Sequence, residues 1–310
     1  MIGGGIPRGR FIEVMGEPST AKSAFGYTVI GAFQRAGAEC LLIDSEAKAD
    51  RVFMERLGID FTKLHYSRGE DLQKCVQMLK NVAEMSDPKN PVLIVWDSIA
   101  STPGAWEADA HSDEKDFTGE KASRARYLSA ALRAFAGKLS RKMVTFIGIN
   151  QLRTQFNFMG STSLTTPGGK APKFTAAVRL MMRMKGRVKH RTHDVVTGML
   201  VDVEAAKNTL AAPFRHCQVR LNFDTGFAPY SGLDELLLRH GRIQQKGGWL
   251  LYKDKSFHAG DIERIITEVP DLIAPLTTSV GDEQAALDLS SSTEPKEEAP
   301  SQVETPAGEE

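Results

Sequence analysis

The chain has 310 residues, of which 41% are hydrophobic and 25% are charged, and its formal net charge is zero. This composition is ordinary for a soluble globular protein, and neither an apolar run of about 18 residues nor a signal-peptide core is present, which excludes a membrane protein and favours the cytoplasm. The three cysteines, Cys40, Cys75 and Cys217, lack CxxC spacing, so we expect reduced thiols.

The first segment with a chemical signature is a predicted strand, Phe11–Met15, that leads through a loop into a predicted helix. The loop reads Gly16-Glu17-Pro18-Ser19-Thr20-Ala21-Lys22-Ser23. This context is typical of a phosphate-binding loop, in which backbone N–H groups bind phosphate oxygens, Lys22 bridges the outer phosphates and Ser23 can ligate Mg²⁺. Ala21 stands where the pattern has glycine, which costs on the order of 1 kcal/mol if φ must be positive. A chance match in an ordinary strand–turn–helix is the alternative.

Three further apolar segments predict buried strands that end in polar residues. They are Glu39–Ile43 before Asp44-Ser45-Glu46, Pro91–Trp96 before Asp97-Ser98, and Val144–Ile149 before Asn150-Gln151. Apolar residues closed by Asp97 match the Walker B pattern, and open α/β sheets bind ligands at the carboxyl ends of their strands. Because this pattern follows a phosphate loop with another strand between, it indicates one nucleotide site.

Apolar residues at steps of three and four predict three helices between these strands. The residues predicted to face inward are Val52, Phe53 and Leu57, then Leu72, Val76, Leu79 and Val82, then Ala125, Leu128, Leu132, Phe135 and Leu139. The arginines on the other faces of the last helix, among them Arg124, are expected to be solvated.

The second half of the chain begins with a polar, glycine-containing stretch. From Thr154 to Pro167 we expect a mobile loop, in which Phe156, Phe158 or Met159 could wedge between nucleic-acid bases, with packing inside the loop as an equal alternative. Three predicted strands follow, Ala177–Met182, Met199–Glu204 and Cys217–Phe223, and a basic hairpin joins the first two.

The end of the chain changes in composition. We expect a small C-terminal subdomain over residues 231–278, with a hairpin around Gly247-Gly248-Trp249. From Asp282 onward nine acidic residues and one lysine give a charge of −8, which leaves +8 for the rest of the chain. The acidic tail, residues 279–310, is rich in Ser and Pro and is predicted to be disordered. A basic body indicates an anionic partner with which the tail competes, although a solubilising tail explains the charge equally well.

These motifs, taken in order, carry a resemblance to a known family. They are the phosphate loop, Ile43-Asp44-Ser45-Glu46, Val92–Ser98, Phe146–Arg153, Gly168–Phe174 and Ala206–Phe214. Together they resemble the RecA family of homologous-recombination ATPases from about Gly3 to Tyr230, and Pro229–Leu233 and the loop without its second glycine are most similar to the UvsX-type recombinases of bacteriophages. The resemblance implies an α/β fold, with a RecA-like P-loop ATPase core at residues 11–230 whose mostly parallel central sheet is flanked by helices. Residues 1–10 would be a linker.

The resemblance assigns catalytic roles. Glu46 matches the glutamate that orients and deprotonates the attacking water, which agrees with its expected position at a strand end. Gln151 would sense the γ-phosphate and pass its state to the following loop. Lys207 would reach the ATP of the neighbouring protomer, as Lys22 reaches the protomer's own.

The resemblance also assigns binding roles at the nucleotide. Lys22 and Ser23 would hold phosphates and Mg²⁺, and Asp97 would act through the water shell of the metal. Asp50 and Phe53 match positions that contact the adenine.

The DNA-binding roles implied by the resemblance fall on two loops, Trp106–Gly119 and Thr154–Pro167. Residues expected to lie near or in the DNA site are Arg126, Arg133, Arg153, Phe156, Phe158, Gly168 and Gly169. Arginines and loop backbone bind phosphates without reading sequence, which suits such a role.

The function implied is an ATP-dependent recombinase of phage type, stimulated by single-stranded DNA, that forms filaments for homologous pairing and strand exchange. Its cofactors would be ATP and Mg²⁺. Its partners would be single-stranded and homologous duplex DNA, other copies of the chain and a single-strand-binding protein or mediator. A non-catalytic RecA-fold mediator and a helicase-type motor are the alternatives. The resemblance begins at the linker that follows the family's N-terminal polymerisation arm, so we expect either a truncated start or assembly through another contact. Thr209 stands where the family has the second of two lysines that act between subunits, and weak self-association without DNA is expected.

Overall fold

The computed structural model describes residues 2–104, 117–156, 162–165, 171–190 and 192–273. The chain divides into two compact units, residues 1–263 and 264–310. The predicted first DNA loop lies outside the described residues except for residues 117–119. Phe158, Met159, Gly168 and Gly169 also lie outside them, as does the acidic tail.

The larger unit is built on a nine-stranded sheet with the order β11-β10-β9-β8-β1-β5-β4-β2-β3. The strands that pair in parallel are β1 (Phe11–Gly16), β2 (Glu39–Asp44), β3 (Leu64–Arg68), β4 (Val92–Asp97), β5 (Val144–Gln151) and β8 (Val178–Lys189). Strand β8 also pairs antiparallel with β9 (Val196–Asn208), and the remaining strands, β10 (His216–Asn222) and β11 (Gly226–Phe227), continue the antiparallel part of the sheet. The predicted mostly parallel sheet is confirmed.

Alternation along the buried strands sends side chains to two separate cores. In β2, Cys40 and Leu42 enter one core, whereas Leu41 and Ile43 enter the other. Helix α1 (Lys22–Arg35) covers the first face of the sheet, and α3 (Leu72–Met85) and α5 (Phe117–Arg141) cover the second. Because both faces are covered, the central strands read as continuous apolar runs.

The helix predictions are confirmed in large part. Leu128, Leu132, Phe135 and Leu139 of α5 are buried, as are Leu72, Val76 and Leu79 of α3. The prediction for Val52 was wrong, because this residue of the short helix α2 (Arg51–Arg56) is exposed and Met54 occupies the core in its place.

Three strands, β3, β6 (Arg153–Phe156) and β7 (Thr162–Thr165), were not predicted because their sequences lack an apolar run. Strand β3 lies at the sheet edge and follows a 3₁₀ turn, Phe61–Lys63, and its residues are exposed or half-buried. Within the expected mobile loop, β6 and β7 pair as an antiparallel ribbon, so its described parts are strands. The short helix α6 (Ala171–Thr175) then leads into β8.

Residues after β11 form smaller elements. They are α7 (Leu233–Arg239), β12 (Gln244–Lys246), β13 (Trp249–Tyr252), β14 (Lys255–Phe257), a 3₁₀ turn (Ala259–Asp261), α8 (Ile262–Glu268) and a last 3₁₀ turn (Pro270–Leu272). The hairpin expected around Gly247 is confirmed, because Lys246 pairs with Trp249 and Gly247 has a φ of +60°. The boundary expected at residue 231 stays a prediction. Among the described residues, helices long and apolar enough to traverse a bilayer are absent.

Candidate active site

The predicted phosphate loop connects β1 to α1 as the sequence indicated. Ala21 is the residue before the helix and has a φ of +66°, so alanine occupies a left-handed position that glycine would adopt without strain. Gly16 must be glycine, because a Cβ there would overlap the carbonyl oxygen of Met182 on the neighbouring strand. The first N–H groups of a helix have no intrahelical acceptor, so the loop presents donors for an anion at the start of α1.

Lys22 lies within this loop rather than in solvent. Its side chain donates to the carbonyl of Glu17 and to Thr20 Oγ1 at 3.2 Å, and the residue is only 7% exposed. Burial lowers the pKa of Lys22, while the carboxylates of Asp97, Glu46 and Glu17 oppose that shift. A buried amine whose charged form is favoured by three carboxylates suits a ligand that brings both phosphates and a cation.

Asp97 ends β4 and is buried beside the phosphate loop. Burial raises the pKa of Asp97 to about 6, and a hydrogen bond from Ser23 partly offsets this shift. The contact brings together the two residues predicted to serve the metal. A buried carboxylate and a hydroxyl are oxygen donors of the kind that Mg²⁺ binds, and Mg²⁺ usually retains several waters. The residues present therefore fit this ion.

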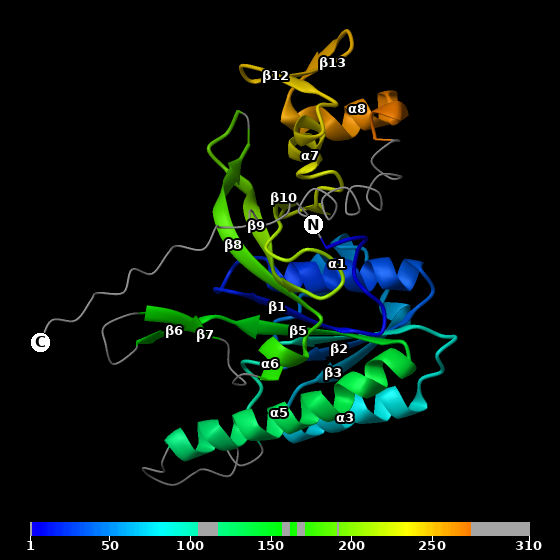
Figure 1. Cartoon of the computed structure of the whole chain (residues 1–310), viewed down its shortest axis with the longest axis vertical. Coiled ribbons are helices and arrows are strands. Elements are labelled where there is room, and N and C mark those ends of the chain that lie inside the picture. The colour runs from blue at the N-terminus through cyan, green and yellow to red at the C-terminus, as the bar shows by residue number, and fades with distance from the viewer. Residues whose placement is uncertain (1, 105–116, 157–161, 166–170, 191, 274–310) are drawn as a thin grey trace, which may run out of the picture. The chain divides into compact units, whose positions relative to one another are not determined.

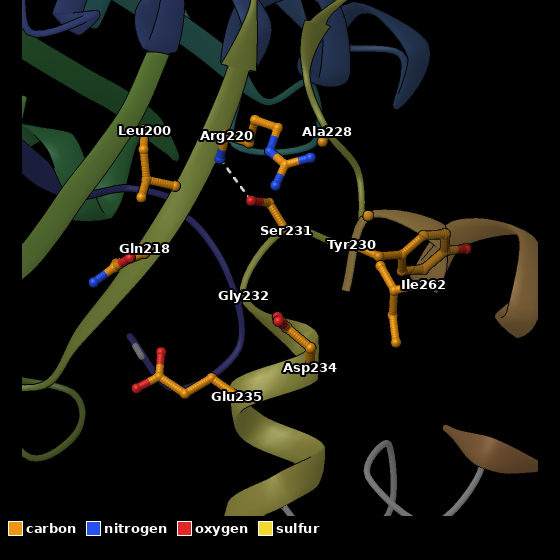
Figure 2. Close-up of a pocket in the computed structure, with 11 residues that line it drawn as sticks. Leu200, Gln218, Arg220, Ala228, Tyr230, Ser231, Gly232, Asp234, Glu235 and Ile262 are labelled. Carbon is orange, nitrogen blue, oxygen red and sulfur yellow. Dashed lines mark hydrogen bonds between the residues drawn. The ribbon is translucent and has the colours of Figure 1, made fainter. Parts of the chain in front are cut away.

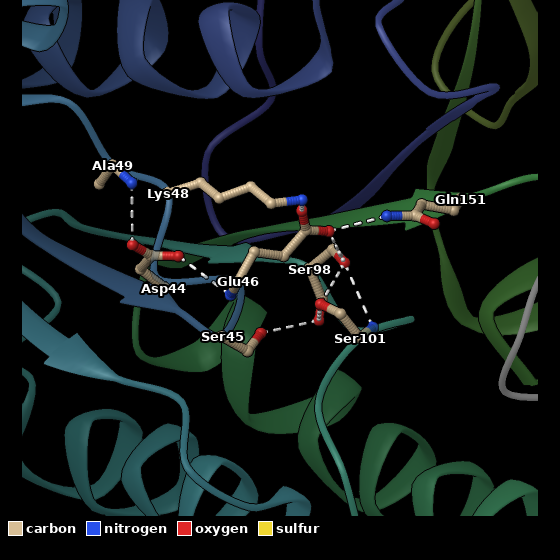
Figure 3. A network of polar contacts seen from close by, with 8 residues as sticks. All are labelled: Asp44, Ser45, Glu46, Lys48, Ala49, Ser98, Ser101 and Gln151. Carbon is tan, nitrogen blue, oxygen red and sulfur yellow. Dashed lines mark hydrogen bonds and ion pairs between the residues drawn. The ribbon is translucent and has the colours of Figure 1, made fainter.

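Glu46 is the centre of a polar network at the carboxyl ends of β2, β4 and β5 (Figure 3). Its Oε1 accepts hydrogen bonds from Ser98 Oγ at 3.0 Å and from Gln151 Nε2 at 2.7 Å. Its Oε2 lies 2.9 Å from Lys48 Nζ. Burial alone would raise the pKa of Glu46, but the hydrogen bonds from Lys48, Ser98 and Gln151 outweigh it and hold the pKa below its ordinary value. Glu46 is therefore ionised at neutral pH and can accept a proton.

Partly buried polar contacts fix the segment that carries Glu46. The Asp44 carboxylate accepts from the N–H groups of Glu46 and Ala49 at 3.1 and 3.2 Å, and from the Tyr66 hydroxyl at 3.1 Å. Ser45 Oγ donates to the carbonyl of Ser98 at 2.9 Å and so joins the ends of β2 and β4.

The sequence did not predict the contacts of Lys48 and Ser98 with Glu46, or that Asp44 fixes the backbone on both sides of Glu46. Their closeness in sequence to the predicted site residues could have indicated them. Each lies within two residues of Glu46 or Asp97, at strand ends that parallel pairing brings together.

Asp50 and Phe53 lie just beyond this network. Asp50 is the N-cap of α2, and its carboxylate accepts from the Phe53 N–H at 2.7 Å. Phe53 packs partly buried against the first core. Capping accounts for Asp50 without a ligand, so contact of either residue with adenine stays a prediction.

Lys207 lies on β9 in different surroundings. Its Nζ donates to the carbonyls of Lys173 and Phe174 at 3.1 and 2.9 Å, at the end of α6. Burial and the Arg179 guanidinium lower the pKa of Lys207, and Glu13 opposes them. Lys207, Phe174 and Thr209 line a cavity of about 250 Å³.

The predicted DNA-binding residues are only partly described. Arg126 and Arg133 are exposed on α5, and Arg153 and Phe156 are the first and last residues of β6. Arg124 differs from the expectation of a solvated side chain, because its Nη2 donates to the carbonyls of Ile99 and Ala100 at 2.7 and 3.0 Å. It ties α5 to the segment after β4.

A second cavity of about 240 Å³ lies between β9, β10 and α7 (Figure 2). Its lining residues are Leu200, Gln218, Arg220, Ala228, Tyr230, Ser231, Gly232, Asp234, Glu235, Gly260 and Ile262. The lining includes none of the predicted site residues, and it mixes both signs of charge.

Comparisons with known proteins agree with this arrangement. A family model described as the RecA N-terminal domain matches residues 1–228. A protein named Protein RecA from Rubrobacter xylanophilus is 30% identical over 279 residues, which cover 89% of this chain and 78% of the relative. Another Protein RecA, from Paracoccus denitrificans, is 29% identical over 272 residues, which cover 87% of this chain and 74% of the relative. The chain therefore belongs to the RecA family of recombinases.

Proposed function

We propose that this protein hydrolyses ATP with Mg²⁺ in response to single-stranded DNA and forms nucleoprotein filaments that carry out homologous pairing and strand exchange. The observation that carries the proposal is the hydrogen bond of 2.7 Å between Glu46 and Gln151, together with the electrostatic effect of Glu46 on the Lys22 amine. An ionised carboxylate beside the phosphate-loop lysine is the arrangement that water activation requires.

The Glu46–Gln151 hydrogen bond also links the nucleotide site to the segment proposed to bind DNA. Gln151 ends β5, and Arg153 begins β6 two residues later. A change at the γ-phosphate that alters the Glu46–Gln151 bond would therefore reach the β6–β7 ribbon directly. Arg126, Arg133 and Arg153, with Phe156, Phe158, Gly168 and Gly169, are the residues proposed to bind DNA.

The remaining roles follow from the loop and the strand ends. Residues 16–23 would hold the phosphates, Asp50 and Phe53 would contact the adenine, and Ser23 and Asp97 would hold Mg²⁺. The ion, when bound, would neutralise charge on the β- and γ-phosphates. Lys207 would reach the nucleotide of a neighbouring protomer. A phage-type assembly, a single-strand-binding protein and a mediator belong to the same proposal.

The proposal is tested by phosphate release from ATP with and without single-stranded DNA, in Mg²⁺ and in excess chelator. We expect hydrolysis that needs Mg²⁺ and rises with DNA of any sequence, and that Lys22→Ala abolishes. Because we expect contacts with DNA phosphates to supply most of the binding free energy, DNA affinity should fall steeply between low and moderate salt. Hydrolysis unaffected by DNA, or equal in Lys22→Ala, would remove the proposed function.

A further inference from the structure

The segment between β2 and α2 bends so that the side chains of Glu46 and Lys48, two residues apart in the sequence, contact each other. Ala47 has a φ of +52°, in the left-handed region that costs a residue other than glycine about 1–2 kcal/mol. Asp44 holds both sides of this bend through the N–H groups of Glu46 and Ala49. Lys48 consequently reaches back to Glu46, as Figure 3 shows. Backbone strain that surrounding contacts maintain is concentrated at functional sites.

Lys48 is held far less firmly than the other lysine of this cluster. Its side chain is 78% exposed, whereas that of Glu46 is 18% exposed. An exposed ion pair contributes only about 0–1 kcal/mol, so Lys48 can exchange Glu46 for another anion at little cost. Lys22, in contrast, is buried and bonded to its own loop.

The two lysines approach Glu46 from different segments. Lys22 comes from the phosphate loop and is close enough for Glu46 to affect its pKa. Lys48 comes from the bend after β2, and its charged form is favoured by Glu46, then by Asp97 and Asp44. A phosphoryl group bound to Lys22 would consequently lie near the carboxylate that Lys48 contacts.

We propose that Lys48 is a further catalytic residue, a cation supplied by the same protomer that leaves Glu46 and binds the γ-phosphate when ATP is present. The inference rests on the proposed ATP hydrolysis. In that reaction the water oxygen bonds to Pγ, the bond from Pγ to the bridging oxygen breaks, and its electron pair stays with ADP. Glu46 takes the proton of the water. Lys48 stabilises charge on the transferred phosphoryl oxygens, and its departure frees Glu46 Oε2 to accept that proton.

The test compares Lys48→Met and Lys48→Arg with a matched control, Lys74→Met. Lys74 is also exposed and paired with a carboxylate, Glu70, at 2.8 Å, but it lies on α3 outside the site. Equilibrium binding of ADP and of a slowly hydrolysed ATP analogue is measured first, because only the analogue carries a γ-phosphate. Phosphate release under saturating ATP is measured second.

We expect Lys48→Met to weaken binding of the analogue about fivefold, the equivalent of about 1 kcal/mol, and to leave ADP binding unchanged. Its turnover should fall about 10–100-fold, below the loss seen for a fully buried donor, and Lys48→Arg should retain most activity. Lys74→Met should match the wild type. Equal losses for ADP and the analogue, or wild-type binding and turnover in Lys48→Met, would overturn the inference. Absence of hydrolysis by the wild type would instead remove the proposed function, and the binding comparison would still decide the role of Lys48.

Discussion

The surroundings of Lys22 and Lys207 differ in the sign of the charges nearest to each amine. Burial lowers the pKa of both lysines. Around Lys22 the carboxylates of Asp97, Glu46 and Glu17 oppose this shift, whereas beside Lys207 the guanidinium of Arg179 adds to it. The first region therefore holds counter-charges within one protomer and suits a metal–nucleotide complex. The second has less negative charge close by and suits an anion brought by another molecule.

The contacts of the two amines support the same distinction. Lys22 is bound within its own loop, whereas Lys207 is bound to the carbonyls that end α6. If Lys207 binds the nucleotide of a neighbour, it must release α6, the helix that follows the predicted DNA loop. The first region is therefore suited to the chemistry of hydrolysis, and the second to detecting a neighbouring protomer.

The largest effect is expected in the first region. Glu46→Gln should lose about 10²–10⁴-fold in turnover, because it removes the proposed general base, while ATP binding persists. Steady-state phosphate release and binding of an ATP analogue measure the two effects. Glu39→Gln is the control, since Glu39 is an exposed carboxylate at the start of β2 paired with His65. Wild-type turnover in Glu46→Gln would remove this carboxylate from the mechanism.

The second region is tested by Lys207→Ala. DNA-stimulated hydrolysis should fall to the basal rate, because the variant loses the cation proposed to stabilise the transferred phosphate between protomers, and isolated protomers should still bind ATP. Phosphate release with a DNA titration checks this, and Lys63→Ala, which removes an exposed lysine paired with Asp60, is the control. Full DNA stimulation in Lys207→Ala would show that a different residue acts on the nucleotide of the neighbouring protomer.

Glu13 provides the negative charge of the second region, and its ion pair with Arg179 should contribute to the stability of the folded protein. It is fully buried, lies 2.5 Å from Arg179 Nε and accepts from Asn150 Nδ2 at 3.0 Å. Glu13→Gln should lower the free energy of unfolding by about 3–5 kcal/mol, because it leaves the nearly buried guanidinium without its partner. Denaturant unfolding measures the loss. Glu204→Gln breaks a more exposed pair with Arg183 and should cost less than about 1 kcal/mol, and equal losses in both variants would contradict the account.

Asp97 is the corresponding test in the first region, with a smaller effect of opposite sign. Since burial raises its folded pKa to about 6 from 3.8, ionised Asp97 destabilises the nucleotide-free protein. This penalty is absent below the unfolded pKa, grows as pH rises towards 6 and is complete above it, where it reaches on the order of 3 kcal/mol. Asp97→Asn should therefore raise the melting temperature at pH 8 more than at pH 5, in chelator without ATP. An equal or larger gain at pH 5 would show that burial does not raise this pKa.

The sequence predicted most of what depends on buried apolar runs and local motifs. We could predict four strands, β1, β2, β4 and β5, and the phosphate loop. Each of these strands is buried on both faces, so it reads as an apolar run, and each ends next to predicted site residues. The sequence did not predict β3, whose residues lie half-exposed at an edge, and it placed Val52 inward because a short helix offers too few turns for its period to be decisive.

The contacts of the site were less predictable than its residues. Glu46 and Gln151 were both expected, but only the parallel register of β2, β4 and β5 shows that their side chains meet. Lys48 belongs to no recognised motif. It reaches Glu46 because Ala47 adopts a left-handed backbone conformation, which no helix or strand preference indicates. Such effects of backbone geometry do not follow from the preferences of single residues.

Strand exchange between single-stranded DNA and a labelled duplex tests the central claim most directly. We predict that the protein, with ATP and Mg²⁺, displaces the labelled strand when the single strand is homologous to the duplex and does not when it is heterologous. Glu46→Gln should pair homologous DNA but turn over ATP slowly. Displacement regardless of homology would instead identify a motor, and hydrolysis of ATP without any displacement would contradict the assignment of recombinase activity.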